Sequence, residues 1–413
     1  MQNQFFQVVS VEKFRSLLNS FPPLTEKERV SLADACGRVL AGDITAGEHI
    51  PPFHRSSMDG YAVAAADTFG ASESSPAYLD IMGHVDIERI PEINLESGQC
   101  AGVVTGSSLP EGADSVVMQE YCHPVGSAAL QITHAVAPGE NVLFKGEDCS
   151  PGDTAVPGNA VLNSGQIGIL AALGIPAVPV YRRPRAGIIV TGDELVPVED
   201  SPHGAQIRDV NSHSISCLIA QSGAQPVIYG IVPDEEEDMA HVLHTACQEC
   251  DLLLISGGSS VGTRDVTLGA MGRLPDFHLL AHGVSISPGK PTILASSGSL
   301  PLIGLPGQIT SAQVVTMVLI RPFLEYLQGR RQFPGDDATG RPRAALSRNI
   351  ASKQGREDYV RTRLKHQDGQ LVAEPVLGPG GLLRTLLEAD GLIRIPENAE
   401  GLQKGETAEI LPL

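Results

Sequence analysis

The sequence has no tryptophan, few other aromatic residues and too little positive charge to balance its negative charge. Aromatic side chains make up 4 % of the 413 residues, and 29 Lys and Arg stand against 48 Asp and Glu, a net charge of −19. Nucleic acids and anionic lipid surfaces are bound through basic patches. We therefore expect neither a nucleic acid nor a membrane as partner. With 42 % hydrophobic residues, the chain still has enough apolar surface for folded domains with aliphatic cores.

Cysteines are also few. The seven cysteines are scattered along the chain without the dense, even spacing of a disulfide scaffold, and their number is odd. The first twelve residues contain neither Lys nor Arg, and no small-residue cleavage site follows them. Both observations favour a reducing cytoplasm over secretion.

Two stretches lack charge altogether. Residues 154–181 and 291–320 each exceed the roughly 20 residues that a membrane helix requires. Prolines and polar residues interrupt both stretches. In the second, Pro301, Pro306 and Gly307 indicate a buried strand, a turn and a helix rather than a membrane span.

Three β-rich or discontinuous regions are expected outside the centre of the chain. Residues 1–46 contain a helix that begins after Ser10 and a second helix over about 25–38, and with 139–182, where a buried helix is predicted near 164–173, they form one discontinuous domain. Short apolar runs within 47–138, at 61–63, 79–81 and 115–118, predict an inserted β domain. Four further runs within 329–413 predict a small C-terminal β domain, which we expect to be barrel-like.

Residues 183–328 alternate between strand, loop and helix. Strands are predicted at 187–190, 226–229, 252–255 and 302–305, with helices at 212–221 and 310–327. A further helix is predicted after Asp234 as its N-cap, with Glu237 at the capping-box position. The run 252–255 is wholly apolar, as in a strand buried on both faces of a parallel sheet. The predicted fold class is therefore multi-domain α/β plus β, with a central doubly wound α/β domain.

Four polar or glycine-rich segments follow the four predicted strands, at 191–194, 233–235, 256–262 and 306–308. Ligands of open parallel sheets bind at the carboxyl ends of the strands. The segment 256–262 has three glycines and three serines, whose N–H and O–H groups suit phosphate oxygens. It matches neither a dinucleotide-binding nor a Walker A motif. An ordinary tight turn is the alternative interpretation of this loop.

Charged residues near these segments suggest a cation and an anion site. Glu194, Asp234 and Asp265 could hold Mg²⁺ through oxygen ligands, although Asp234 also suits a helix cap. Lys290 is a lone cation between glycine and proline and suits an anion, with a solvated surface lysine as the alternative. Asp59 precedes Gly60, a pair that commonly forms a hairpin turn.

A cluster of two histidines and two cysteines does not predict a metal site. On a helix, His241, His244, Cys247 and Cys250 would spread over about half the circumference, so they could not converge on one ion. Cys247 and Cys250 are instead expected to be small buried residues.

A set of short motifs, taken together, resembles the molybdopterin molybdenumtransferases, the family of MoeA and the gephyrin E domain. The resemblance covers essentially the whole chain, and its motifs occur in the order of the family: Met58–Val63, Val104–Gly106, Gly146–Asp148, Val190–Leu195, Ile207–Asn211, Ser256–Gly258, Ser260–Gly262, Pro288–Pro291, Gly304–Gly307, Gly355–Asp358 and Ala389–Ile393.

The resemblance implies four domains, with 1–46 and 139–182 serving as an elongated linker and dimerisation domain, 183–328 binding molybdopterin, and a homodimer as the assembly. It implies the last step of molybdenum cofactor synthesis, in which adenylylated molybdopterin and molybdate react, AMP is released, and Mg²⁺ assists. It also implies contacts with the molybdopterin adenylyltransferase and with maturation partners of molybdoenzymes.

Roles carry over to individual residues through the same resemblance. Asp59, Asp148 and Glu194 match catalytic positions, and Asp59 is expected to reach the α/β domain of the other subunit. Glu194, Asp234 and Asp265 match metal-binding positions. The positions expected to bind substrate are Thr105, Thr191, Gly192, Asp193, Ser256, Gly257, Gly258, Ser260, Val261, Gly262, Ser287, Pro288, Gly289, Lys290, Pro306, Gly307 and Ser311.

Some positions differ from the pattern that the family usually shows. Ser287 stands where a lysine is usual, which removes one positive charge from an anion site, and His54 and Arg55 are expected to compensate in part. Gly102 and Gln308-Ile309 also differ. These changes leave an alternative open: a paralogue that binds the cofactor and delivers it to a partner enzyme, or one that uses tungstate.

Overall fold

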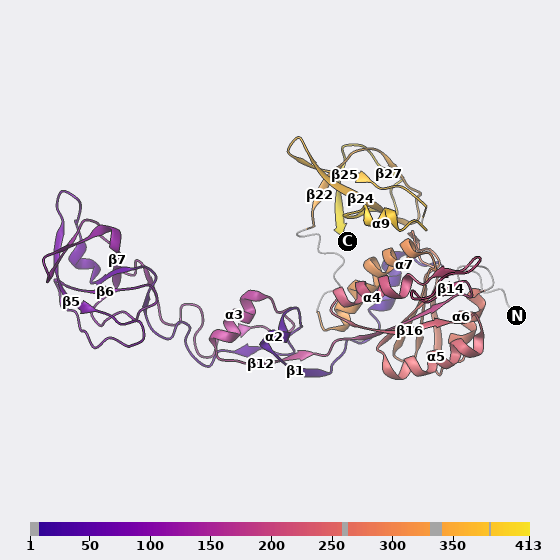
Figure 1. Cartoon of the computed structure of the whole chain (residues 1–413), viewed down its shortest axis with the longest axis horizontal. Helices are drawn as coiled ribbons and strands as arrows, with labels where there is room; N and C mark the ends of the chain where they lie inside the picture. The colour runs from indigo at the N-terminus through magenta and orange to yellow at the C-terminus, as the bar shows by residue number, and fades with distance from the viewer. Residues whose placement is uncertain (1–7, 258–262, 331–340, 380) are drawn as a thin grey trace. The chain divides into compact units, whose positions relative to one another are not determined.

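The computed structural model describes residues 8–257, 263–330, 341–379 and 381–413, with the backbone alone for 263–265 (Figure 1). The chain divides into two compact units. We call residues 29–36 and 42–178 the N-terminal β unit, and residues 1–28, 37–41 and 179–413 the α/β unit. None of the helices in the described ranges combines the length and hydropathy needed to cross a bilayer.

The centre of the α/β unit is a six-stranded sheet of order β16-β13-β17-β21-β20-β18. The first four strands run parallel to one another, and β20 and β18 continue the sheet in antiparallel fashion. The four parallel strands are those predicted from the sequence, whereas β18 and β20 were not predicted. In sheet order the strands are β16 (Gln225–Val232), β13 (Arg185–Thr191), β17 (Leu252–Ser256), β21 (Leu300–Leu305), β20 (Ile293–Ser297) and β18 (Phe277–His282).

Helices cover both faces of this sheet (Figure 1). Ile188 and Val190 of β13 pack in one core with α4 and the helical run α7-η3-α8, whereas Ile189 packs in a second core with α5 and α6. Successive residues of a strand point to opposite faces, so both faces of β13 are buried. This arrangement confirms the doubly wound α/β fold. The helices are α4 (Asn211–Gln221), α5 (Glu236–Glu249), α6 (Thr263–Met271), α7 (Ile309–Val315), η3 (Thr316–Ile320) and α8 (Arg321–Leu327).

Two ends of predicted helices can be compared with the structure. Ser10 accepts a hydrogen bond from the Lys13 N–H at 3.1 Å and caps α1 (Val11–Leu18), as predicted. The predicted cap by Asp234 is wrong, because α5 begins after Glu235 and its N-cap makes no side-chain hydrogen bond. Asp234 instead accepts a hydrogen bond from Thr191 at the end of β13. The proposed capping box with Glu237 therefore does not form.

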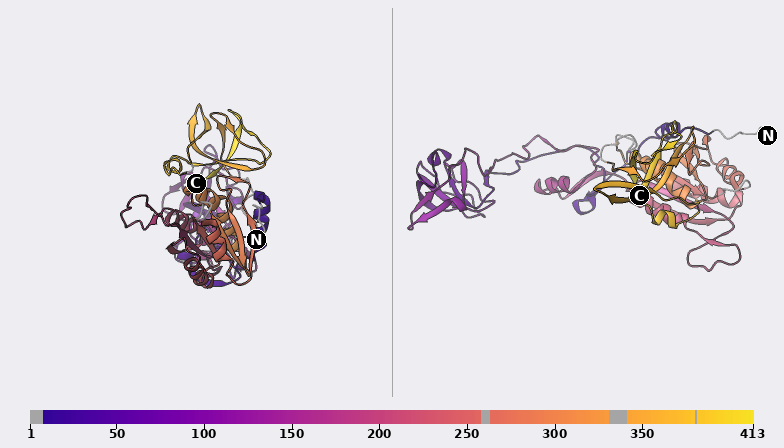
Figure 2. Two further views of the ribbon diagram at one scale, coloured as in Figure 1. Left: turned by 90° about the vertical axis from the view of Figure 1, so that its right-hand side faces the viewer. Right: turned by 90° about the horizontal axis from the view of Figure 1, so that it is seen from above.

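The C-terminal strands close into a small barrel (Figure 2). The hydrogen-bonded order β24-β25-β22-β28-β26 returns to β24, which confirms the barrel-like prediction. Strand β19 (Ile286–Ser287) adds to the barrel parallel to β24, with Ile286 opposite Glu357 and Ser287 opposite Asp358. The elements are β22 (Arg343–Leu346), β23 (Ile350–Ala351), β24 (Glu357–Gln367), β25 (Gln370–Pro375), α9 (Arg384–Leu387), β26 (Gly391–Ile395), β27 (Gly401–Leu402) and β28 (Thr407–Pro412).

The N-terminal β unit contains a second six-stranded sheet, of order β7-β4-β6-β5-β9-β8. The runs at 61–63, 79–81 and 115–118 are strands, as predicted. Leu79, Cys100 and Leu130 contribute to its aliphatic core. The strands are β4 (Gly60–Val63), β5 (Ala77–His84), β6 (Gln99–Val103), β7 (Ser115–Met118), β8 (Cys122–Val125) and β9 (Ala129–Ile132), with η1 (Ala65–Thr68) and η2 (Gln119–Tyr121) between them.

Of two helix predictions near this unit, one is wrong and the other is right in position but not in burial. The segment 25–38 forms β1 (Lys27–Ser31) and only a short helix, α2 (Leu32–Ala35). The helix α3 (Ser164–Ala172) forms behind an Asn163 capping box, but Leu170 is its one buried residue, so it is not the buried helix we expected. The small elements that complete the α/β unit and the β unit are β2 (Ile44–Thr45), β3 (Arg55–Ser56), β10 (Val142–Leu143), β11 (Thr154–Val156), β12 (Ala177–Tyr181), β14 (Leu195–Val196) and β15 (Ile207–Arg208).

Candidate functional site

The carboxyl ends of the parallel strands surround a cavity of about 410 Å³, which we call the strand-end cavity. It is at this edge of the sheet that the sequence predicts ligand binding. Seven of the predicted site residues line the cavity: Thr191, Gly192, Glu194, Asp234, Ser256, Gly257 and Gly307. Four predicted residues of the adjoining loop, Gly258, Ser260, Val261 and Gly262, lie outside the described residues.

Hydrogen bonds connect the acidic residues at the ends of β13 and β16. The Thr191 hydroxyl donates to Asp234 Oδ1. The Asp234 N–H donates to Asp193 Oδ1 at 3.2 Å. Thr191 is buried, Asp234 is half-buried and Glu194 is exposed at the rim. Together these contacts hold Asp234 at the cavity wall, near the loop that carries Glu194.

The carboxylates of Glu194 and Asp234 suit a hard cation. Mg²⁺ in phosphate sites is commonly held by one or two carboxylates, with waters and substrate oxygens completing its coordination. No group of three metal-binding side chains forms among the described residues. The side chain of Asp265, the third predicted ligand, is not among those described. Two carboxylate ligands at the wall of this cavity thus fit a magnesium ion shared with a substrate.

At Gly257, directly after β17, the backbone lies unusually close to the end of β13. Gly257 has a φ of +144°, a conformation that favours glycine, and a Cβ there would lie 2.2 Å from the carbonyl oxygen of Thr191. Any side chain at this position would collide with the end of β13. Glycine is therefore required for the loop to leave β17 beside the cavity.

Asn211, at the first turn of α4, is a cavity residue that our site prediction missed. Its Nδ2 donates to Ser256 Oγ at 2.8 Å and to the Gly307 carbonyl at 2.9 Å. Because a carbonyl only accepts, the nitrogen must face Gly307, which fixes the orientation of the amide. Asn211 is 8 % exposed, and no donor in the described residues reaches its Oδ1. This oxygen is thus a buried acceptor in the wall of the strand-end cavity.

A second cavity of about 690 Å³, which we call the Lys290 cavity, lies between the α/β domain and the C-terminal barrel within the α/β unit. Gln308 lines both cavities, so they are neighbours. The predicted residues Ser287, Pro288, Gly289, Lys290, Pro306 and Ser311 line the second cavity rather than the first. The predicted substrate site is therefore divided between two adjacent cavities.

Three cations and no carboxylate line the Lys290 cavity in the described part of the chain: Lys290, Lys353 and Arg356. Arg356 is held from behind by Asp358, with Nη2 and Oδ2 3.1 Å apart and Nε and Oδ1 3.0 Å apart. Our site prediction missed Lys353 and Arg356. The Gly355–Asp358 motif was a signal for Arg356, whereas no motif marked Lys353.

Asp59 and Thr105 form a compact site in the N-terminal β unit. Asp59 Oδ1 accepts hydrogen bonds from the Thr105 backbone N–H at 2.7 Å and from its hydroxyl at 2.8 Å. These bonds, the backbone one first, hold the pKa of Asp59 below its ordinary value. The carboxylate is exposed and stays ionised at neutral pH. Asp148 lies on an exposed loop, and no hydrogen bond among the described residues joins it to Asp59.

Gly60 does not form the hairpin turn that the Asp-Gly pair suggested. It begins β4, pairs with Val103 and Met118, and is not among the glycines with positive φ. A Cβ at this position would lie 2.0 Å from the Val117 carbonyl oxygen. Glycine is needed here because two strands meet closely, and Asp59 is thereby fixed at the start of a central strand.

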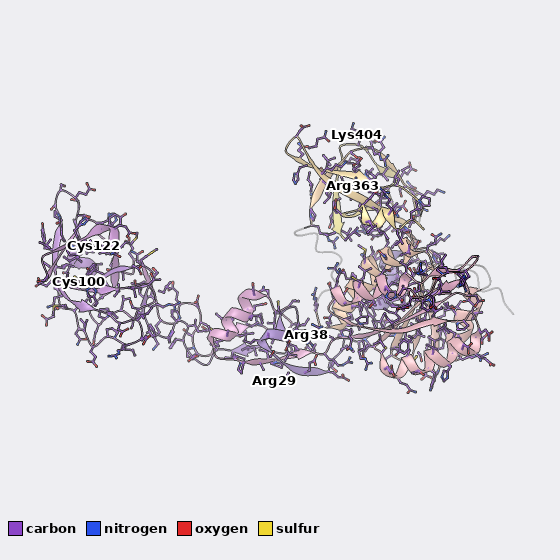
Figure 3. All side chains as sticks on the ribbon, viewed as in Figure 1. Arg29, Arg38, Cys100, Cys122, Arg363 and Lys404 are labelled. Carbon is purple, nitrogen blue, oxygen red and sulfur yellow. The ribbon has the colours of Figure 1, made fainter. Side chains whose placement is uncertain are left out.

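The remaining candidates lie away from both cavities. His54 Nδ1 accepts a hydrogen bond from the Lys145 N–H at 3.2 Å, within the N-terminal β unit. Cys250 is buried, as expected, with its sulfur 3.4 Å from the Tyr229 hydroxyl, but Cys247 is only partly buried. Burial raises the pKa of the Cys247 thiol to about 11, and that of Cys100 and Cys122 to about 12 (Figure 3). These thiols are poor nucleophiles at neutral pH.

Comparison with known proteins agrees with this geometry. Three family models match the chain: the MoeA N-terminal region (domain I and II) at residues 9–174, a probable molybdopterin binding domain at 187–326, and the MoeA C-terminal region (domain IV) at 343–413. A putative molybdopterin biosynthesis protein of Methanocaldococcus jannaschii is 35 % identical over 93 % of this chain and 91 % of its own length. The chain belongs to the MoeA family.

Other members of the family have more specific names. The molybdopterin molybdenumtransferase of Bacillus subtilis is 31 % identical and aligns over 94 % of this chain and 90 % of its own length. The crystal structure of the molybdopterin biosynthesis MoeA protein from Pyrococcus horikoshii superposes with a TM-score of 0.83 at 30 % identity, over 98 % of this chain and all of that one. The MoeA fold predicted from the sequence motifs is therefore confirmed.

Proposed function

We propose that this protein is a molybdopterin molybdenumtransferase, which inserts molybdate into adenylylated molybdopterin and releases AMP. The observation that carries the proposal is the pair of neighbouring cavities that share Gln308. Among the described residues, one is lined by three carboxylates, bare backbone and one cation, Arg208, and the other by three cations and no carboxylate. Such a pair suits a reaction between a cation-assisted phosphate ester and a small oxyanion.

The Lys290 cavity is the proposed site of molybdate. A dianion is stabilised where ammonium and guanidinium groups converge without competing carboxylates. Ser287 and Ser311 add hydroxyl donors to the same wall. The strand-end cavity, with Gly257 and the Asn211 acceptor, would hold the pterin and its pyrophosphate.

Glu194 and Asp234, together with Asp265, are the proposed ligands of Mg²⁺. When bound, the ion would neutralise charge on the pyrophosphate that is to be cleaved. The Thr191 and Asp193 contacts keep the Asp234 carboxylate at the wall, so its position is set before the substrate arrives. Thr191, Gly192 and Asp193 would thus act at the end of β13 by holding ligands and substrate in place.

Asp59 is the proposed catalytic carboxylate, with Thr105 as its positioning residue. Ionised and fixed by two hydrogen bonds, Asp59 could orient the attacking oxygen. We further propose that the protein acts as a homodimer, in which Asp59 of one subunit serves the α/β domain of its partner. Asp148, in the same N-terminal β unit, is proposed to act together with Asp59. The reducing cytoplasm is the proposed compartment, with a molybdopterin adenylyltransferase and molybdoenzyme-maturation proteins as partners.

Release of AMP tests this function directly. We expect the full-length protein to release AMP from adenylylated molybdopterin when molybdate and Mg²⁺ are present. Asp59→Ala should lower the rate at least about a hundredfold, since general acid–base groups contribute about 10²- to 10⁴-fold. Glu73→Ala, which changes an exposed carboxylate of the same unit, serves as the control. A wild-type protein that releases no AMP under these conditions would contradict the proposal.

A second candidate function is binding and delivery of the finished cofactor without metal insertion. Ser287 motivates it, because this residue adds no charge to the wall of the Lys290 cavity. Tight binding of molybdopterin without AMP release would favour delivery. A transferase specific for tungstate is distinguished by a competition experiment. Such a protein would bind tungstate more tightly than molybdate, so equal concentrations of the two would leave tungstate bound.

A further inference from the structure

The Lys290 cavity receives its positive charge from two different parts of the chain. The loop that follows β19 supplies one cation, Lys290, from the side of the α/β domain. The other two, Lys353 and Arg356, lie in the segment that leads into β24 of the barrel. The barrel is thus part of the anion-binding wall and not only a neighbour of it.

Backbone pairing holds this segment against the cavity. Strand β19 runs parallel to β24, with Ser287 opposite Asp358. The Glu357 N–H donates to the Ser285 carbonyl at 2.9 Å. Ser287, with its neutral hydroxyl, and Lys353, in the segment that precedes β24, therefore line the same cavity from two parts of the chain that this pairing holds side by side.

The two barrel cations are not equivalent. Arg356 is paired with Asp358, which also accepts from the Ser352 hydroxyl at 2.5 Å, so much of its charge is balanced within the barrel. Lys353 is exposed and forms no ion pair with any described residue. Lys290 is likewise exposed and outside the ion pairs of the described residues. Lys353 and Lys290 are the two cations whose charge is available to an anion.

We infer that Lys353 is an oxyanion-binding residue that provides, from the barrel, the positive charge that Ser287 does not provide from the loop. The inference rests on the proposed function, because it names a determinant of affinity for the oxyanion substrate. Lys353 lines the Lys290 cavity and is not among the residues that line the strand-end cavity. It therefore acts on the binding of molybdate and not on the chemical step.

Calorimetric titration of the full-length protein with molybdate tests this assignment. Lys353→Ser should weaken molybdate binding about five- to tenfold at low ionic strength, and less at high ionic strength, because exposed charges are screened. Lys353→Arg should bind nearly as well as the wild type. Lys404→Ser removes one exposed lysine from the same barrel, outside the cavity, and is the charge-matched control (Figure 3).

A relocated charge gives the sharpest comparison. The double variant Ser287→Lys with Lys353→Ser should recover most of the lost affinity, because the positive charge returns to the same cavity from the other wall. In the AMP-release reaction, Lys353→Ser should raise the KM for molybdate and leave kcat nearly unchanged.

The outcomes separate this inference from the proposed function. If the wild type releases AMP and Lys353→Ser binds molybdate no more weakly than Lys404→Ser, the role of Lys353 is refuted while the function stands. If the wild type neither binds molybdate nor releases AMP, the proposed function itself fails. A loss of kcat without a change in KM would also overturn the binding role.

Discussion

At the scale of single residues, Asn211 shows how a buried side chain can specify a ligand. Its two N–H donors are used by Ser256 and Gly307, so its Oδ1 remains as the acceptor. Leaving a buried acceptor unpaired costs about 1–3 kcal/mol. A ligand that donates an N–H to this oxygen would gain that amount over an analogue without the donor.

Substitution of Asn211 should therefore affect ligand binding more than its protein contacts alone would explain. We expect Asn211→Leu to weaken molybdopterin binding about ten- to a hundredfold, corresponding to roughly 1–3 kcal/mol. Ser256→Ala removes one partner of Nδ2 but leaves Oδ1 in place, so its effect should be clearly smaller. Equal losses for both variants, measured by fluorescence titration on folded protein, would show that Oδ1 does not contact the ligand.

The residues of the site were partly visible in the sequence. Thr191, Glu194 and Asp234 could be predicted because they follow buried strands, whose carboxyl ends meet at one edge. Lys353 and Asn211 could not be predicted in this way. Lys353 is brought to the cavity by pairing between β19 and β24, and the orientation of Asn211 depends on a carbonyl almost a hundred residues further along the chain.

At the scale of secondary structure, the start of β24 is tied into the fold by a buried ionic cluster. Glu357 accepts from Arg394 at 2.7 Å and 3.0 Å and from the Tyr359 hydroxyl at 2.6 Å. Burial opposes the charge of Glu357, but the Arg394 and Tyr359 hydrogen bonds outweigh it and hold the pKa of this carboxyl below its ordinary value. The cluster lies directly beside the β19 ladder that brings the barrel to the Lys290 cavity.

Loss of this charge should destabilise the barrel. We expect Glu357→Gln to lower the free energy of unfolding by about 1–3 kcal/mol at pH 7, because Arg394 loses its charged partner. Since the pKa of Glu357 is lower in the folded state than in the unfolded state, its stabilisation is present above the unfolded value and is lost as pH falls through the folded value.

Urea unfolding at several pH values checks this prediction. The difference between wild type and Glu357→Gln should be largest near neutral pH and shrink at acidic pH, below the ordinary pKa of a glutamic acid. Glu400→Gln, at an exposed position of the barrel, is the matched control. A difference that does not change with pH would contradict the assigned role of the Glu357 charge.

The four parallel strands of the α/β domain were easier to predict than the antiparallel strands β20 and β18 at the end of the same sheet. Continuous apolar runs such as 252–255 indicate strands buried on both faces, and these were correct. The antiparallel strands β18 and β20 lie in segments with mixed apolar and polar residues, so their pairing depends on the sheet they join. The segment 25–38 was misread as a helix because its spacing of apolar residues also suits a strand followed by one helical turn.

At the scale of the whole molecule, the net charge of −19 is not spread evenly over the sites. The Lys290 cavity is lined by cations alone among the described charged residues, while the strand-end cavity carries Glu194, Asp209 and Asp234 against the single cation Arg208. An acidic protein can therefore take anionic substrates if a few local cations face them. The composition predicts that no polyanionic polymer is bound, but it could not show where the cations gather.

The proposed homodimer makes a prediction that two impaired variants can test. If Asp59 of one subunit serves the α/β domain of its partner, a mixture of Asp59→Ala and Lys290→Ala subunits contains dimers with one intact site. Coexpressed mixed dimers, in which one of the two sites is intact, should show up to about half of the wild-type activity per dimer, whereas dimers of either variant alone should show clearly less. A mixture as inactive as its components, with mixed dimers confirmed by affinity tags, would contradict the shared site.

The central claim is that this protein couples the uptake of molybdate to the release of AMP. The most direct measurement follows both quantities in one reaction of the wild-type protein with adenylylated molybdopterin, molybdate and Mg²⁺. We predict that AMP appears in an amount equal to the molybdenum that becomes bound to the pterin, and that neither appears when molybdate is omitted. Bound pterin with no AMP released and no molybdenum taken up would contradict the account and leave a cofactor-binding protein in its place.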